Sequence, residues 1–98
     1  MFLAKVVGSI VATKKHQAFQ GSKLLLLQPV VAQQRTLVPS GSSVVAIDSV
    51  GAGLDELVMF TQGSSARLAA HSKDTPVDAI IVGIVDRVEI EGTKLERP

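Results

Sequence analysis

The 98-residue sequence contains no cysteine, no tryptophan and no tyrosine. Without cysteine the protein has no disulfide bond, no thiolate nucleophile and no cysteine-based zinc site. Three phenylalanines are its only aromatic residues, and the formal net charge is +1. Small barrels that bind single-stranded nucleic acid depend on aromatic stacking platforms along a basic groove. The composition therefore argues against nucleic acid as a partner and leaves it only as an alternative.

Long hydrophobic runs are scarce as well. The longest extends from Val77 to Val85 and contains Asp78 and Gly83, whereas a membrane-spanning helix needs roughly 20 continuous apolar residues. The apolar N-terminus lacks the basic stretch of a signal peptide and is interrupted by Lys5. We therefore expect a cytoplasmic protein with no membrane association.

The sequence has an excess of apolar side chains, since 46% of the residues are hydrophobic and only 19% are charged. A chain of this length forms a single domain, over residues 1–98, and so small a domain leaves a large share of its surface exposed. One small core cannot bury all of this apolar surface. The composition therefore predicts a protein that works as one subunit of an assembly.

Five segments have the apolar patterns of β-strands. Residues 6–13 alternate with a period of two, whereas the four consecutive leucines from Leu24 to Leu27 offer neither face of a strand to water. Gly21 and Pro29 bracket these leucines too closely for a stable helix. The predicted strands cover residues 6–13, 23–31, 44–47, 57–61 and 79–91, the last of which begins apolar on both faces and ends alternating with charged residues.

Two further segments complete the predicted fold. Residues 33–43 are typical of a surface loop that connects a hairpin, and residues 63–71 of one short helix capped by Ser64 or Ser65. Five short strands with one helix predict an all-β fold. A small five-stranded OB-like β-barrel is the architecture we expect, because closure removes strand edges that would otherwise aggregate.

The glycines and serines form no complete catalytic motif. Gly51 and Gly53 do not extend to a dinucleotide-binding loop, because Glu56 stands at the position of the third glycine. A nucleophile elbow centred on Ser65 would need a glycine where Arg67 stands. The same segment could bind an anion at a helix N-terminus, but an ordinary helix cap is the simpler explanation.

The titratable residues are equally dispersed. His16 and His71 each lack a second histidine at metal-binding spacing and are typical of solvated loops. Asp48, Asp78 and Asp86 interrupt apolar strands, as paired general acids would. A position at the barrel rim, or at a subunit interface with an arginine partner, is the simpler explanation. The candidate partners are Arg67 and Arg87. We expect no catalytic residue, no cofactor and no metal site.

Several short segments carry a family resemblance. They are residues 8–15 (GSIVATKK), 23–25 (KLL), 48–53 (DSVGAG), 63–67 (GSSAR) and 77–86 (VDAIIVGIVD). Each is weak alone, but their order and spacing over most of the chain are specific. Together they resemble the bacterial microcompartment vertex proteins, the EutN/CcmL family of ethanolamine-utilization and carboxysome shells.

The resemblance implies a structural protein and not an enzyme. It implies a β-barrel subunit of a cyclic homopentamer that caps the vertices of an icosahedral shell, where sheets of hexameric shell proteins must curve to close around encapsulated enzymes. The partners would be further copies of the chain and those hexameric proteins. The GSSAR form favours a catabolic compartment, although residues 23–28 also look carboxysomal. The alternative function is an OB-like module that binds single-stranded nucleic acid.

Candidate site residues follow from the ring. Small residues near a five-fold axis let backbones approach closely, so Gly51, Ala52 and Gly53 are the candidate pore loop, with a tight hairpin at the rim as the competing account. A head-to-tail ring needs two different complementary patches on each subunit, which would explain strands that are apolar on both faces. The candidate subunit-interface residues are Leu24, Leu25, Leu26, Leu27, Ser64, Ser65, Arg67, Ile81 and Val85.

Overall fold

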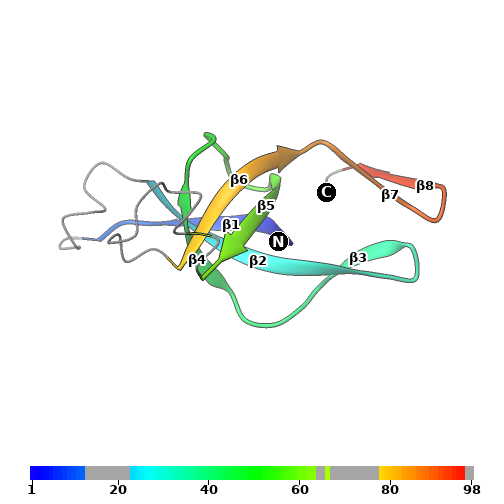
Figure 1. The fold of residues 1–98 in the computed structure, drawn as a ribbon, viewed down its shortest axis with the longest axis horizontal. Helices are drawn as coiled ribbons and strands as arrows, with labels where there is room; N and C mark the ends of the chain where they lie inside the picture. Colours follow the sequence, from blue (N-terminus) through cyan, green and yellow to red (C-terminus); the bar gives the residue numbers. More distant parts are fainter. Residues whose placement is uncertain (13–22, 64–65, 67–77, 97–98) are drawn as a thin grey trace.

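The computed structural model describes residues 1–12, 23–63, 66 and 78–96, and these residues form eight β-strands (Figure 1). Most of the predicted helix over residues 63–71 lies outside the described residues, as do His16 and His71. No helix of the described residues is long and apolar enough to cross a bilayer. The strands are β1 (Phe2–Ile10), β2 (Lys23–Gln33), β3 (Thr36–Pro39), β4 (Val44–Asp48), β5 (Leu57–Gln62), β6 (Ala79–Val85), β7 (Arg87–Ile90) and β8 (Thr93–Glu96).

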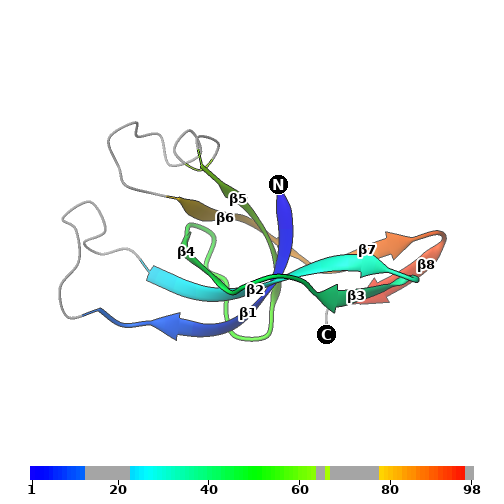
Figure 2. The same cartoon turned by 90° about the horizontal axis from the view of Figure 1, so that it is seen from below.

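Five of these strands close into a barrel (Figure 2). Around the ring, β1 pairs with β2, β2 with β4, β4 with β6, β6 with β5, and β5 with β1 again. The pairing of β4 with β6 is parallel, and the other four pairings are antiparallel. The predicted five-stranded OB-like barrel is thus confirmed, and each of the five strands is paired on both sides over at least part of its length.

The barrel interior is filled by alternate residues of the five strands. Cross-strand partners such as Val6 with Leu27 and Leu25 with Ala46 lie on the same side of the sheet, and all four are buried. Phe60 and Ile81, also cross-strand partners, complete the largest part of the core. In β1 the buried residues are Ala4 and Val6, and in β2 the register shows which leucines point inward.

Two hairpins extend beyond the barrel and give the subunit its long axis, with extents of 45 × 25 × 22 Å (Figures 1 and 2). The first joins the end of β2 to β3 through Gln34 and Arg35, with φ angles of 50° and 66°. The second joins β7 to β8 through Glu91 and Gly92, with φ angles of 48° and 79°. Both are two-residue loops whose left-handed residues match the twist of the flanking strands.

The structure corrects three of the predicted boundaries. The first strand begins at Phe2 instead of residue 6, and part of the loop predicted over residues 33–43 is strand β3. The single strand predicted over residues 79–91 is two strands, because β6 ends at Val85 and β7 begins at Arg87 after the bend at Asp86. Strand β7 pairs only with β8, in a separate two-stranded sheet.

Candidate pore loop and subunit interface

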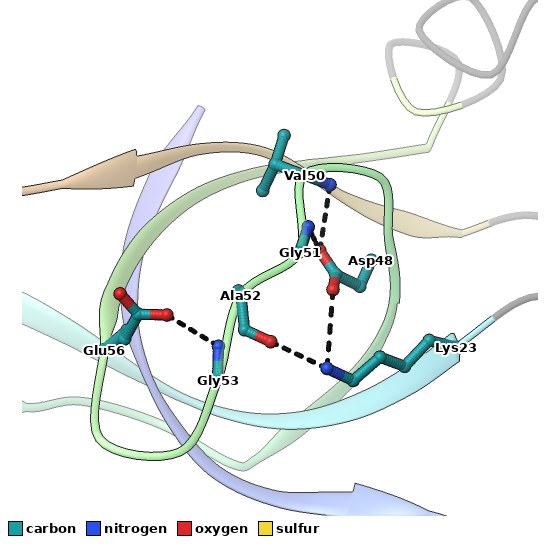
Figure 3. Close-up of polar contacts among 7 residues, drawn as sticks. All are labelled: Lys23, Asp48, Val50, Gly51, Ala52, Gly53 and Glu56. Carbon is teal, nitrogen blue, oxygen red and sulfur yellow. Dashed lines mark hydrogen bonds and ion pairs between the residues drawn. The ribbon is translucent and has the colours of Figure 1, made fainter.

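The loop that connects β4 to β5 is held at its start by Asp48 (Figure 3). The side chain of Asp48 is only 2% exposed, and its Oδ1 atom accepts hydrogen bonds from the backbone N–H groups of Val50 at 3.0 Å and Gly51 at 3.1 Å. A carboxylate that accepts bonds from the following residues forms a local turn of the kind aspartate favours. Asp48 therefore shapes the backbone of residues 48–51.

Lys23 ties the middle of the same loop to the barrel. It is the cross-strand partner of Asp48, and its Nζ atom lies 3.8 Å from the Asp48 Oδ2 atom. The same ammonium group donates a hydrogen bond of 2.9 Å to the carbonyl oxygen of Ala52 (Figure 3). One cation thus neutralises the buried carboxylate and satisfies a loop carbonyl, which is what makes burial of Asp48 tolerable.

The end of the loop is fastened to β1. The backbone N–H of Gly53 donates a hydrogen bond of 2.7 Å to the Oε1 atom of Glu56 (Figure 3). The Val6 N–H donates to the carbonyl of Glu56 and the Asp55 N–H donates to the carbonyl of Val6, both at 2.9 Å. Lys5 adds an exposed ion pair with Asp55 at 3.6 Å. Both ends of the loop are therefore fixed, so its tip is a preformed surface feature.

The structure separates the three predicted pore residues. Gly51 is exposed and Gly53 half-buried, but Ala52 has no exposed surface and belongs to the barrel core. The side chain of Ala52 therefore faces the barrel interior and not the surface of the loop. The exposed apolar side chains of the loop are Val50 and Leu54, at 39% and 66% exposure. Val50 and Leu54 are the sequence neighbours of Gly51 and Gly53, and this proximity is the only feature of the sequence that could have identified them.

Of the two glycines in this loop, Gly51 adopts a left-handed backbone conformation that other residues rarely adopt. Its φ angle is +79°, whereas the backbone of Gly53 is outside the left-handed region and an added Cβ there would meet Glu56 Oε1 at an ordinary 3.5 Å. We expect Gly51→Ala to lower the free energy of unfolding by about 1–2 kcal/mol. Gly53→Ala is the matched control and should change it by less than about 0.5 kcal/mol. Urea unfolding followed by circular dichroism measures both, and equal losses would contradict the assignment.

Asp48 offers a second test of the loop. Asp48→Ala removes the acceptor of two backbone N–H groups and the partner of Lys23, so we expect a loss of about 2–3 kcal/mol in the free energy of unfolding. Asp48→Asn keeps an oxygen that can accept the N–H bonds and loses the ion pair, so its loss should be smaller, about 1 kcal/mol. Chemical denaturation of both variants separates the two contributions. A harmless alanine substitution would show that Asp48 does not shape the loop.

The predicted interface residues divide by strand face. Leu25, Leu27 and Ile81 are at most 2% exposed and fill the barrel of their own subunit, so their side chains offer almost no surface to a neighbour. Leu24, Leu26 and Val85 are partly exposed and stay candidates. The remaining candidates, Ser64, Ser65 and Arg67, lie outside the described residues. Alternate residues of one strand point to opposite sides, so a run of leucines divides between the core and the outside.

Register places further apolar residues beside the outward leucines. Ile10 is the cross-strand partner of Leu24, and Val45 is that of Leu26. Val45 is 49% exposed and Ile10 36% exposed. Gly8, opposite Leu26, adds no side chain to this surface. Ile10, Leu24, Leu26 and Val45 therefore form one apolar surface across β1, β2 and β4, here called the outer apolar face. The prediction from sequence missed Ile10 and Val45, although the first lies in a strand with clear alternation.

The described residues bring together no set of groups suited to another chemistry. They contain no cluster of three or more histidine, cysteine, aspartate or glutamate side chains that could hold a metal ion. Asp78 and Asp86 are exposed, and Asp48 is engaged by the loop. Phe60 is buried in the core, and the ring of Phe2 packs against it at a centroid distance of 5.5 Å.

Both the sequence and the fold are similar to known proteins. Residues 1–86 match the family model described as ethanolamine utilisation protein EutN/carboxysome. The bacterial microcompartment shell vertex protein EutN of Salmonella typhimurium is 47% identical over 92 residues, which are 94% of this chain and 90% of that protein. The GrpN pentameric microcompartment shell protein from Rhodospirillum rubrum matches with a TM-score of 0.79 at 44% identity, covering 92% of this chain and 99% of that one. CcmL from Gloeobacter violaceus matches with a TM-score of 0.82 at 41% identity, covering 96% and 94% respectively.

Proposed function

The chain belongs to the EutN/CcmL family of microcompartment vertex proteins, and we propose that it closes the vertices of such a shell as a homopentamer. Its role is structural, and its place is in the protein shell of a bacterial microcompartment. A pentamer supplies the curvature that a flat sheet of hexagonal tiles lacks. The protein then acts through its shape and its contacts, and catalyses no reaction.

The outer apolar face is the observation of this structure that carries the proposal. The barrel is closed and its core is filled, yet Ile10 and Val45 stand exposed next to Leu24 and Leu26. A contiguous apolar surface on a small domain marks a contact with another protein. In a ring with head-to-tail contacts, one such surface on each subunit meets a different surface of the next. The pentamer thus accounts for the apolar excess of the composition.

The pore loop takes its place in this arrangement as a proposal too. A loop tip that is fixed at both ends presents Gly51 to solvent with no side chain, between the exposed side chains of Val50 and Leu54. Five copies of such a tip can approach closely around a symmetry axis. We place the axial opening of the ring at this tip, lined by Gly51 with Val50 and Leu54 at its margin.

The partners of the ring would be hexameric shell proteins, whose tiles meet at the vertex. That the compartment is a catabolic one stays a prediction from the GSSAR segment. Relatives named for two different compartments resemble the chain over more than nine tenths of its length: EutN of Salmonella typhimurium at 47% identity and CcmL of Gloeobacter violaceus at 41% identity. Neighbouring genes for hexameric shell proteins and for encapsulated enzymes would identify the compartment.

Mass measurement by light scattering after size-exclusion chromatography tests the proposal directly. We expect a single species with the mass of five subunits, each of 10.3 kDa. In a second experiment, a hexameric shell protein is expressed with and without this chain, and the assemblies are compared by electron microscopy. We expect closed particles when the chain is present and open sheets or tubes when it is absent. A chain that stays monomeric at high concentration would refute the proposal.

A further inference from the structure

Among the described residues, the hairpin formed by β7 and β8 is paired with no strand of the barrel. Its two strands pair only with each other, and among the described residues neither makes more than marginal contact with any other strand. An isolated two-stranded hairpin is at best marginally stable in water. Its tip is linked to the tip of the other hairpin by Arg35 and Glu91, whose Nε and Oε2 atoms are 2.9 Å apart. These side chains are 62% and 70% exposed, so the pair contributes at most about 1 kcal/mol.

One face of this hairpin is apolar. Val88 and Ile90 are half-buried, whereas Arg87 and Glu89, which alternate with them in β7, are exposed. Val88 and Ile90 therefore project from the same side of the two-stranded sheet. A strand with this alternation is built to lie with its apolar side on another surface.

A second apolar feature of the subunit is a groove on the barrel. It has a volume of about 280 Å³ and lies between the start of β1, the second half of β2 and the loop before β4. Phe2 and Val31, which line it, are 52% and 48% exposed. Its polar rim consists of uncharged groups, including Ser40, Ser42 and Gln62. No residue of the β7–β8 hairpin lines this groove, so the hairpin of the same subunit does not fill it.

The lining of the groove suits inserted side chains. An apolar groove with an uncharged rim can take one or two aliphatic side chains presented by a strand. Val88 and Ile90 are side chains of this kind, and among the described residues their hairpin pairs with no strand of the barrel.

We propose that the β7–β8 hairpin of each subunit docks through Val88 and Ile90 in the groove beside Phe2 and Val31 of a neighbouring copy. The inference rests on the proposed function, because a ring provides a neighbour for every hairpin and every groove. Hairpin and groove are two different patches of one chain, as a head-to-tail contact requires. The contact covers both unsatisfied surfaces at once, and it joins the subunits at the end of the barrel where the hairpins project (Figure 2).

Cross-linking between two differently tagged versions of the chain tests this contact. The natural sequence has no cysteine, so every thiol is an engineered one. Chains with Val31→Cys are co-expressed with chains that carry Ile90→Cys, and the purified assembly is treated with a short bis-maleimide. We expect a covalent heterodimer of the two tags. The matched control replaces Ile90→Cys by Glu89→Cys, whose side chain leaves the other side of β7, and should give a far weaker band.

A second readout needs no cross-linker. Val88→Ser combined with Ile90→Ser should raise the concentration at which the pentamer dissociates by at least about tenfold, which corresponds to 1.4 kcal/mol. Glu89→Ser should leave that concentration unchanged. The proposed hairpin contact is overturned if the wild-type chain forms pentamers but cross-linking gives no heterodimer above the control. It is also overturned if the double variant dissociates at the same concentration as the wild type; neither outcome contradicts the proposed function. A wild-type chain that never forms a pentamer would instead refute the proposed function.

Discussion

Val45→Asp is expected to convert the pentamer into folded monomers. Val45 is 49% exposed in the isolated subunit and belongs to the outer apolar face, opposite Leu26. The aspartate can stay hydrated in the monomer, so the barrel should keep its stability. In the ring the same carboxylate would be buried without a partner, at a cost of several kcal/mol for each interface, roughly 3–5 by analogy with broken buried ion pairs.

Two measurements on the same sample decide this result. Light scattering should report the mass of one subunit, while circular dichroism and thermal unfolding should match a natural subunit diluted below its dissociation concentration. Val45→Thr is the matched control, because it has nearly the same shape and no charge, and it should keep the pentamer. A pentameric Val45→Asp variant would place the subunit interface away from the outer apolar face.

Ile81→Asp is expected to abolish folding itself. Ile81 has no exposed surface and is the cross-strand partner of Phe60, the largest buried side chain of the barrel. A carboxylate at this position would be buried away from water, at a cost of several kcal/mol. The total stability of a domain is about 5–15 kcal/mol, so this one change removes most or all of it.

The expected readout is loss of the β-sheet signal in circular dichroism together with loss of soluble protein. Ile81→Val removes one methylene at the same site and should cost only about 0.5–1.5 kcal/mol in urea unfolding. A folded monomeric Ile81→Asp variant would mean that Ile81 faces a neighbour and not the core. Comparing Ile81→Asp with Val45→Asp therefore distinguishes a side chain in the barrel core from one on the outer surface, because the first change should prevent folding and the second only assembly.

Local patterns were sufficient for the central strands but not for the hairpins. The barrel strands could be predicted because β-branched and leucine-rich runs between glycine and proline signals have few alternatives. The turn at Gln34 and Arg35 has two left-handed residues and no glycine or asparagine, so no local signal marked it. The second turn does contain a glycine, at Glu91-Gly92, between residues that alternate in polarity. This turn signal was not used in the prediction from sequence, and strand β8 after it was not predicted.

The candidate site was predicted less completely, for a related reason. Asp48 was expected at a rim or an interface with an arginine partner, and the structure gives it two backbone N–H groups and Lys23 instead. That cation comes from a position 25 residues earlier in the chain and meets Asp48 only because β2 pairs with β4. Long-range pairing of this kind has no signature in a window of sequence.

The sequence by itself determined the class of the protein. Its missing cysteines, its few aromatics, its excess of apolar residues and the order of its five short segments were enough for a β-barrel that works in an assembly. Only the tertiary structure decided which apolar residues the subunit keeps and which it offers to a neighbour. A strand that is apolar on both faces carries no internal sign of its orientation, and the register with β1 and β4 sends Leu25 and Leu27 inward and Leu24 and Leu26 outward.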